Sequence, residues 1–121
     1  MRSLKILLVE DNEIFQQIQA HMLTRLGHEV VTASSGQKAL ATLKLFSFDV
    51  ILMDLVMPEM DGFECARQIR EINIQTPIVA LSGNDSQETK DACFDAGMSG
   101  YLKKPTDKDT FEFMMQQVLA Q

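Results

Sequence analysis

Three apolar runs in this chain each end at side chains that could bind a metal ion or a phosphate. Asp54 directly follows the apolar residues 50–53. Glu10 and Asp11 follow a second apolar run, and Lys104 follows a weaker third one. Because an Asp side chain is almost never fully buried without a partner, Asp54 needs a neighbouring group. Apolar segments that each stop at a charged residue are typical of parallel strands whose carboxyl ends meet at one site.

The three carboxylates would repel one another if they met without a counter-ion. Two unit charges about 4 Å apart cost about 4 kcal/mol at an effective dielectric constant of roughly 20. Such a cluster must hold protons or bind a cation. A few oxygen ligands that are open to solvent suit Mg²⁺, with Mn²⁺ as a substitute. We expect Asp11 and Asp54 to be the first ligands, with a backbone carbonyl of the following loop as a third.

Two further groups favour phosphoryl chemistry at this cluster. Lys104 supplies an ammonium, and Ser82 supplies a hydroxyl at the end of another apolar segment. A cation, an ammonium and a hydroxyl around one carboxylate can stabilise phosphoryl oxygens. The carboxylate of Asp54 is the available nucleophile. The residues therefore predict an aspartyl phosphate on Asp54.

Each of these residues also has a purely structural interpretation. Asp54 could form a turn, Glu10 and Asp11 could cap a helix, Ser82 could cap another, and Lys104 could be a solvated charge. Their joint occurrence at four strand ends favours a single site over four unrelated structural roles.

The elements that must position these residues alternate along the chain. Five short apolar segments alternate with five stretches of helical periodicity, which predicts an α/β fold. A single (βα)5 doubly wound parallel sheet in the order 2-1-3-4-5, flavodoxin-like, is expected for one domain over residues 1–121. That order places the first and third strands side by side. We expect strands at 4–9, 29–33, 50–54, 77–81 and 100–103, and helices at 12–26, 34–45, 62–72, 85–96 and from 106 or 107 onward. The first helix is expected to bury one face, formed by Phe15, Ile18, Met22 and Leu26.

Composition limits the partners and the setting. The chain has 121 residues and a net charge of −6, which argues against nucleic acid as a direct partner. No apolar run approaches the roughly 18 residues of a membrane span, and no signal peptide is recognised, so we expect a cytoplasmic protein without membrane contact. Cys65 and Cys93 lack metal-like spacing and are expected as reduced, buried thiols.

Four segments resemble the receiver domain of two-component response regulators. They are residues 7–12, 54–62, 80–82 and 96–105. Residues 10–12, 57–62 and 93–98 look most like receivers attached to hybrid sensor histidine kinases. The resemblance implies that the phosphoryl group comes from a phosphohistidine of a sensor histidine kinase or a histidine phosphotransfer domain. It also implies that the module catalyses only its own phosphorylation and dephosphorylation. The chain could stand alone or form the cytoplasmic part of a membrane-bound hybrid kinase.

The resemblance also assigns roles to individual residues. Asp11, Asp54 and the backbone carbonyl of Val56 would bind Mg²⁺, and Glu10 would act through a water molecule. Lys104 would pair with the phosphoryl oxygens, and its bond to the following proline would be cis. Many receivers carry Asp where this chain has Glu10.

The family's conformational switch would use Ser82 and Tyr101. Ser82 would move toward the phosphoryl group, and Tyr101 would swing inward. This motion would change the surface formed by the fourth helix, the fifth strand and the fifth helix, which would meet a downstream effector or a second copy. Phe94, Tyr101 and Phe113 are expected on that partner surface, and Ile14 is expected to contact the phosphodonor.

Competing functions lack residues that they need. A phosphatase of the haloacid-dehalogenase type requires a second Asp two residues after the nucleophile, where this chain has Val56. A flavodoxin requires a phosphate loop after the first strand, where this chain has an acidic segment. A receiver-like interaction module that works without phosphorylation stays open. The phosphate lifetime also stays open, because Val56 offers no side-chain hydrogen bond to an attacking water whereas Asn84 does.

Overall fold

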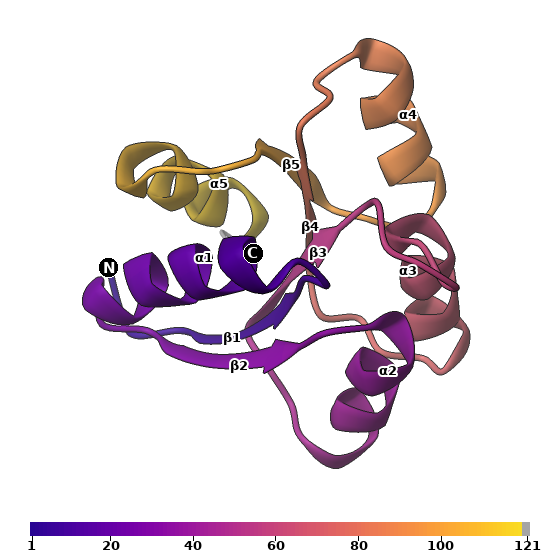
Figure 1. The fold of residues 1–121 in the computed structure, drawn as a ribbon, viewed down its shortest axis with the longest axis horizontal. Helices are drawn as coiled ribbons and strands as arrows, with labels where there is room; N and C mark the ends of the chain where they lie inside the picture. The colour runs from indigo at the N-terminus through magenta and orange to yellow at the C-terminus, as the bar shows by residue number, and fades with distance from the viewer. Residues whose placement is uncertain (120–121) are drawn as a thin grey trace.

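Five strands and five helices alternate along residues 1–119, the part of the chain that the computed structural model describes (Figure 1). All strand pairings are parallel, in the order β2-β1-β3-β4-β5. The expected α/β fold and its strand order are therefore confirmed. The strands are β1 (Lys5–Val9), β2 (Glu29–Ala33), β3 (Val50–Asp54), β4 (Ile78–Ser82) and β5 (Gly100–Lys103).

Helices cover both faces of the sheet. Figure 1 shows α1 and α5 on one face and α2, α3 and α4 on the other. Successive residues of a strand point to opposite faces, and β1 divides its side chains in this way: Ile6 and Leu8 pack in the core under α1 and α5, whereas Leu7 and Val9 pack in the other core. The helices are α1 (Glu13–Arg25), α2 (Gly36–Leu45), α3 (Gly62–Glu71), α4 (Gln87–Asp95) and α5 (Lys108–Leu119).

Short polar side chains cap the helices and set where they begin. Asn12 accepts a hydrogen bond from a backbone N–H of the first turn of α1, and Ser35 does the same for α2. Asp107 caps α5 through the N–H of Thr110. Helix α4 begins later than expected, because Ser86 is its cap. Neither the acidic pair before α1 nor Ser82 caps a helix, so those structural interpretations were wrong.

One expectation about the core was also wrong. Met22 and Leu26 pack against the core as predicted, but Ile18, which the sequence placed on the same inward face of α1, is 52% exposed. The buried residues of α1 are Gln19 and Leu23. The inward face of α1 therefore combines Gln19 and Leu23 with Met22 and Leu26, and Ile18 lies outside it. Cys65 and Cys93 are free and buried, as expected.

Within residues 1–119, the structure contains no helix with the length and apolar character needed to cross a membrane.

Candidate acidic site at the carboxyl edge of the sheet

The candidate site residues meet at the carboxyl ends of four strands. Asp54 and Ser82 are the last residues of β3 and β4, and Lys104 follows β5. The ends of β3 and β4 lie side by side, because Asp54 of β3 pairs with Leu81 of β4, the residue before Ser82. A pocket of about 310 Å³ opens at this edge. It is lined by Glu10, Asp11, Asn12, Phe15, Asp54, Val56, Ser82, Gly83 and Lys104.

Three carboxylates form one cluster in this pocket. Glu10, Asp11 and Asp54 each offer an oxygen, and these oxygens lie within 4.8 Å of one another. Glu10 and Asp54 are buried, whereas Asp11 is exposed and keeps the cluster open to solvent. An oxygen-only donor set with one open side fits Mg²⁺, which retains several waters, and Mn²⁺ fits the same set.

Lys104 neutralises the buried part of the cluster. Its Nζ atom lies 2.7 Å from Oε1 of Glu10 and 3.3 Å from Oδ1 of Asp54. Burial alone would lower the pKa of the Lys104 ammonium, but the hydrogen bond to Glu10 and the charges of Asp54 and Glu10 outweigh it, so the pKa lies above its usual value. Lys104 is therefore a permanent cation here. Its peptide bond to Pro105 is cis, as the resemblance implied.

Asp54 has an altered acidity. Burial raises the pKa of its carboxyl to about 7, and the hydrogen bond and negative charge of Glu10 act in the same direction. The charge of Lys104 and the N–H of Val56, 3.4 Å from Oδ1 of Asp54, oppose the rise. Without a bound metal ion, the carboxyl of Asp54 is thus close to half protonated at neutral pH.

This acidity makes the metal-free protein sensitive to pH in a specific direction. The folded state holds a proton on Asp54 up to about pH 7, whereas the unfolded chain releases it near pH 4. Stability therefore falls as the pH rises through this window and then levels off. We expect Asp54→Asn to be more stable than the parent by about 2 kcal/mol at about pH 8, after allowing for solvent screening, by less than about 1 kcal/mol at about pH 5, and to match it below about pH 4.

Urea unfolding with a chelator measures this difference, and comparing the two proteins cancels the other titrating groups. Added Mg²⁺ should raise the unfolding midpoint of the parent more than that of Asp54→Asn. A difference between the two proteins that stays constant from about pH 5 to about pH 8 would contradict the burial of an ionisable Asp54.

Ser82 and Tyr101 meet at one backbone carbonyl. The Ser82 hydroxyl donates to the Asn84 carbonyl at 3.2 Å and accepts from the Asn84 N–H at 3.0 Å. The Tyr101 hydroxyl donates to the same carbonyl. The ring of Tyr101 is half-buried, and the ammonium of Lys90 lies 5.5 Å from its centre. Asn84 is thus a physical link between the two residues of the expected switch, which the sequence did not indicate.

Two other residues of the pocket were missed as site residues. Phe15 was assigned to the core, but it is half-buried and its ring lies 4.5 Å from Nζ of Lys104. Asn12 accepts the N–H of Phe15 at 3.0 Å and holds the first turn of α1 at the pocket. The available signal was the position of Phe15 one helical turn after Asp11.

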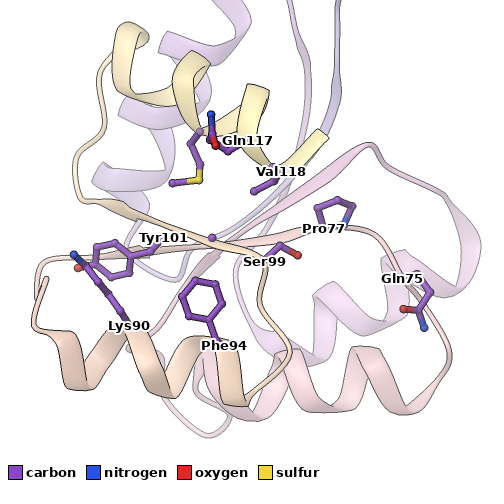
Figure 2. A pocket seen from close by; sticks show the side chains of 10 residues that line it. Gln75, Pro77, Lys90, Phe94, Ser99, Tyr101, Gln117 and Val118 are labelled. Atoms are coloured by element: carbon purple, nitrogen blue, oxygen red, sulfur yellow. The ribbon is translucent and has the colours of Figure 1, made fainter. Parts of the chain in front are cut away.

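The residues expected to meet partners lie at the surface in two places. Ile14 is 69% exposed and belongs to α1, next to the pocket. Phe94 and Tyr101 line a separate groove of about 630 Å³ between α4, β5 and α5 (Figure 2). Phe113 is 62% exposed and lies outside the groove lining.

Comparisons with known proteins identify relatives along nearly the whole chain. A family model described as the response regulator receiver domain matches residues 6–116. The hybrid signal transduction protein dokA of Dictyostelium discoideum is 40% identical over 110 residues, covering 88% of this chain and 6% of that protein. The sensor histidine kinase RcsC of Salmonella typhimurium is 35% identical over 115 residues, covering 95% of this chain and 12% of that protein. The chain thus spans only a small part of these relatives.

Solved structures agree with this result. The Vibrio cholerae chemotaxis protein CheY4 is 37% identical, with a TM-score of 0.89 over 98% of this chain and 100% of that one. The receiver domain of the sensor histidine kinase PA1611 of Pseudomonas aeruginosa is 34% identical, with a TM-score of 0.88 over 99% and 100% of the two chains. That structure has a magnesium ion coordinated in its active-site cleft.

Proposed function

This chain belongs to the response regulator receiver domain family, which serves two-component and phosphorelay signal transduction, and we propose that Asp54 is its phosphoacceptor. The observation that carries the proposal is the placement of Asp54. Its buried carboxylate lies between an acidic pair and Lys104, at the floor of a pocket that opens to solvent. A nucleophile with a cation site on one side and an ammonium on the other is suited to phosphoryl transfer.

The proposed donor is a phosphohistidine. An oxygen of Asp54 attacks the phosphorus atom, the new O–P bond forms as the P–N bond breaks, and the released imidazole takes up a proton. Lys104 then exchanges its contact with Asp54 for a phosphoryl oxygen. Ser82 exchanges its bonds to Asn84 for another phosphoryl oxygen. Both donors thereby stabilise negative charge that is absent before transfer.

The chain's own residues fit a divalent cation next to this nucleophile. Asp11, Asp54 and the Val56 carbonyl would hold Mg²⁺, or Mn²⁺ in its place, and Glu10 would bind it through water. The bound cation supplies positive charge that neutralises the phosphoryl oxygens and favours ionised Asp54. The magnesium ion in the similar receiver domain of PA1611 supports this assignment.

The relatives support a proposal about the partners. A sensor histidine kinase or a histidine phosphotransfer domain would supply the phosphoryl group, with exposed Ile14 beside the pocket as a contact. Because the chain spans 6% and 12% of two kinase-related proteins, we propose that it works either alone or as part of a hybrid kinase. As a module it would catalyse only its own phosphorylation and dephosphorylation.

The experiment that tests phosphoacceptance compares the parent with Asp54→Asn. We expect acetyl phosphate and Mg²⁺ to add one phosphoryl group to the parent, seen by intact-mass spectrometry, and none to the variant. A chelator should abolish the addition in the parent. A parent that stays unmodified and also fails to bind beryllofluoride would favour an interaction module that works without phosphorylation.

The switch has an unusually direct probe, because the chain contains one tyrosine and no tryptophan. Its intrinsic fluorescence therefore reports on Tyr101 alone. Beryllofluoride with Mg²⁺ should draw Ser82 away from Asn84 and release the Tyr101 hydroxyl from the same carbonyl. We expect a fluorescence change in the parent that is lost in both Ser82→Ala and Asp54→Asn. An unchanged spectrum in a parent that binds beryllofluoride would contradict this coupling.

The output surface proposed for this switch is the groove beside Tyr101. Phe94 reaches it from α4, and Val118 closes it from α5 (Figure 2). Met114 of α5 also lines it. Movement of Tyr101 would reshape the groove for an effector or a second copy, with Phe113 at its margin. Sedimentation of the beryllofluoride-loaded protein measures whether the parent self-associates. If it does, and the double variant Phe94→Ala with Phe113→Ala self-associates equally, a second copy does not bind at this groove.

A further inference from the structure

Phe15 lines the acidic pocket and lies against Lys104, a placement that packing of a partly buried helix residue does not explain. It lies in the first turn of α1, where its N–H is fixed by the Asn12 side chain. Within the described residues 1–119, it is the one aromatic side chain that lines the acidic pocket. The centre of its ring is 4.5 Å from Nζ of Lys104. This distance is within the range of a cation–π contact.

The contact matters because the other neighbours of Lys104 change during the reaction. Glu10 and Asp54 hold the ammonium at 2.7 and 3.3 Å. Carboxylate oxygens that bind a divalent cation attract an ammonium less strongly, because the charge of the cation repels the ammonium. A lysine side chain also has many rotamers. Lys104 would then be free to leave the pocket, although its side chain is only 14% exposed.

The Phe15 ring is not affected in this way. It carries no charge and offers no oxygen to a hard cation, while its face attracts an ammonium in every state of the site. We propose that Phe15 is a positioning residue for phosphoryl transfer, whose ring face keeps Lys104 over the pocket while Glu10 and Asp54 serve the cation and the phosphoryl group. This inference rests on the function proposed above.

The alternative role of Phe15 is that of an apolar wall, and the two roles respond differently to substitution. Phe15→Leu keeps an apolar side chain but removes the ring. Phe15→Tyr keeps the ring and its attraction for a cation. Ile18→Leu is the matched control, because Ile18 is exposed on the same helix and outside the pocket lining.

The test is a titration with beryllofluoride in the presence of Mg²⁺, together with urea unfolding of each protein. We expect Phe15→Leu to bind beryllofluoride about fivefold more weakly, a loss in the range of one cation–π contact. Phe15→Tyr should stay within about twofold of the parent, and Ile18→Leu should equal it. Weakening by the same factor in Phe15→Leu and Phe15→Tyr, or in neither, overturns the inference.

Proton NMR adds a readout of the contact itself, which needs neither metal nor activity. The methylene protons next to Nζ of Lys104 should show an upfield ring-current shift in the parent and in Phe15→Tyr, and lose it in Phe15→Leu. Random-coil values in the parent would overturn the inference. A parent that shows the shift but binds no beryllofluoride overturns the proposed function, and this inference with it. A parent that binds beryllofluoride while Phe15→Leu binds it equally well overturns the inference alone.

Discussion

Replacing Lys104 with methionine is expected to destabilise the metal-free protein by about 3 kcal/mol at neutral pH and to abolish phosphorylation by acetyl phosphate. Methionine keeps most of the side-chain length and removes the charge. Glu10 is fully buried, and its nearest cation is Nζ of Lys104 at 2.7 Å. Removing one partner of a buried ion pair leaves an uncompensated charge, which is why the cost exceeds that of a surface pair.

The loss of stability in Lys104→Met should depend on pH and on Mg²⁺. It should shrink at about pH 5, because Asp54, whose pKa is about 7 in the parent, is then protonated and one of the two neighbouring negative charges is removed. It should also shrink on addition of Mg²⁺. Lys103→Met, which removes a neighbouring exposed charge, should change stability by less than about 0.5 kcal/mol. Urea unfolding measures all three proteins. Equal stability of Lys104→Met and Lys103→Met at neutral pH would show that Glu10 does not depend on Lys104.

Substituting Gly62 with alanine should have the second-largest effect, although the change adds a single carbon atom. A Cβ atom at Gly62 would lie 2.3 Å from the carbonyl oxygen of Asp54 and 2.9 Å from Cα of Leu55. Both are backbone atoms of the segment that carries the proposed nucleophile, and Gly62 also donates its N–H to the Leu55 carbonyl at 3.0 Å. Overpacking against backbone cannot be relieved by a rotamer change, so we expect a loss of about 3 kcal/mol.

The backbone shift that relieves this overpacking should move Asp54 and slow its phosphorylation, measured at a temperature where Gly62→Ala remains folded. Gly83→Ala is the stability control, because a Cβ atom there would meet nothing within 4 Å. Urea unfolding and the acetyl phosphate reaction provide the two readouts. If Gly62→Ala has the stability of Gly83→Ala and the phosphorylation rate of the parent, the close approach of α3 to the end of β3 is not required.

The fold class and the meeting of the strand ends could be predicted because apolar runs and their polar ends carry that information directly, whereas the strand order followed from the general rules for doubly wound sheets. Asp54 and Ser82 each end a buried strand, and parallel neighbours bring such ends to one edge. Periodicity was less reliable for α1. Met22 and Leu26 pack against the core as predicted, but Gln19 is buried where Ile18 was expected, so residue type alone misplaced one residue of the inward face.

The details of the site could not be predicted, because they depend on distances between segments that are far apart in sequence. Lys104 lies closer to Glu10 than to Asp54. The shared contact of Ser82 and Tyr101 with the Asn84 carbonyl depends on how the loop after β4 turns toward β5. The close approach of Gly62 to the end of β3 is likewise a property of the folded chain.

The measurement that tests the central claim most directly is to locate the phosphoryl group on the chain. The parent would be treated with acetyl phosphate and Mg²⁺, reduced with borohydride, digested and sequenced by mass spectrometry. Because reduction of an aspartyl phosphate leaves homoserine, we predict homoserine at position 54, and its absence from a sample treated with chelator. Homoserine at another aspartate, or none in a protein that has gained a phosphoryl group, would contradict the assignment of Asp54 as the phosphoacceptor.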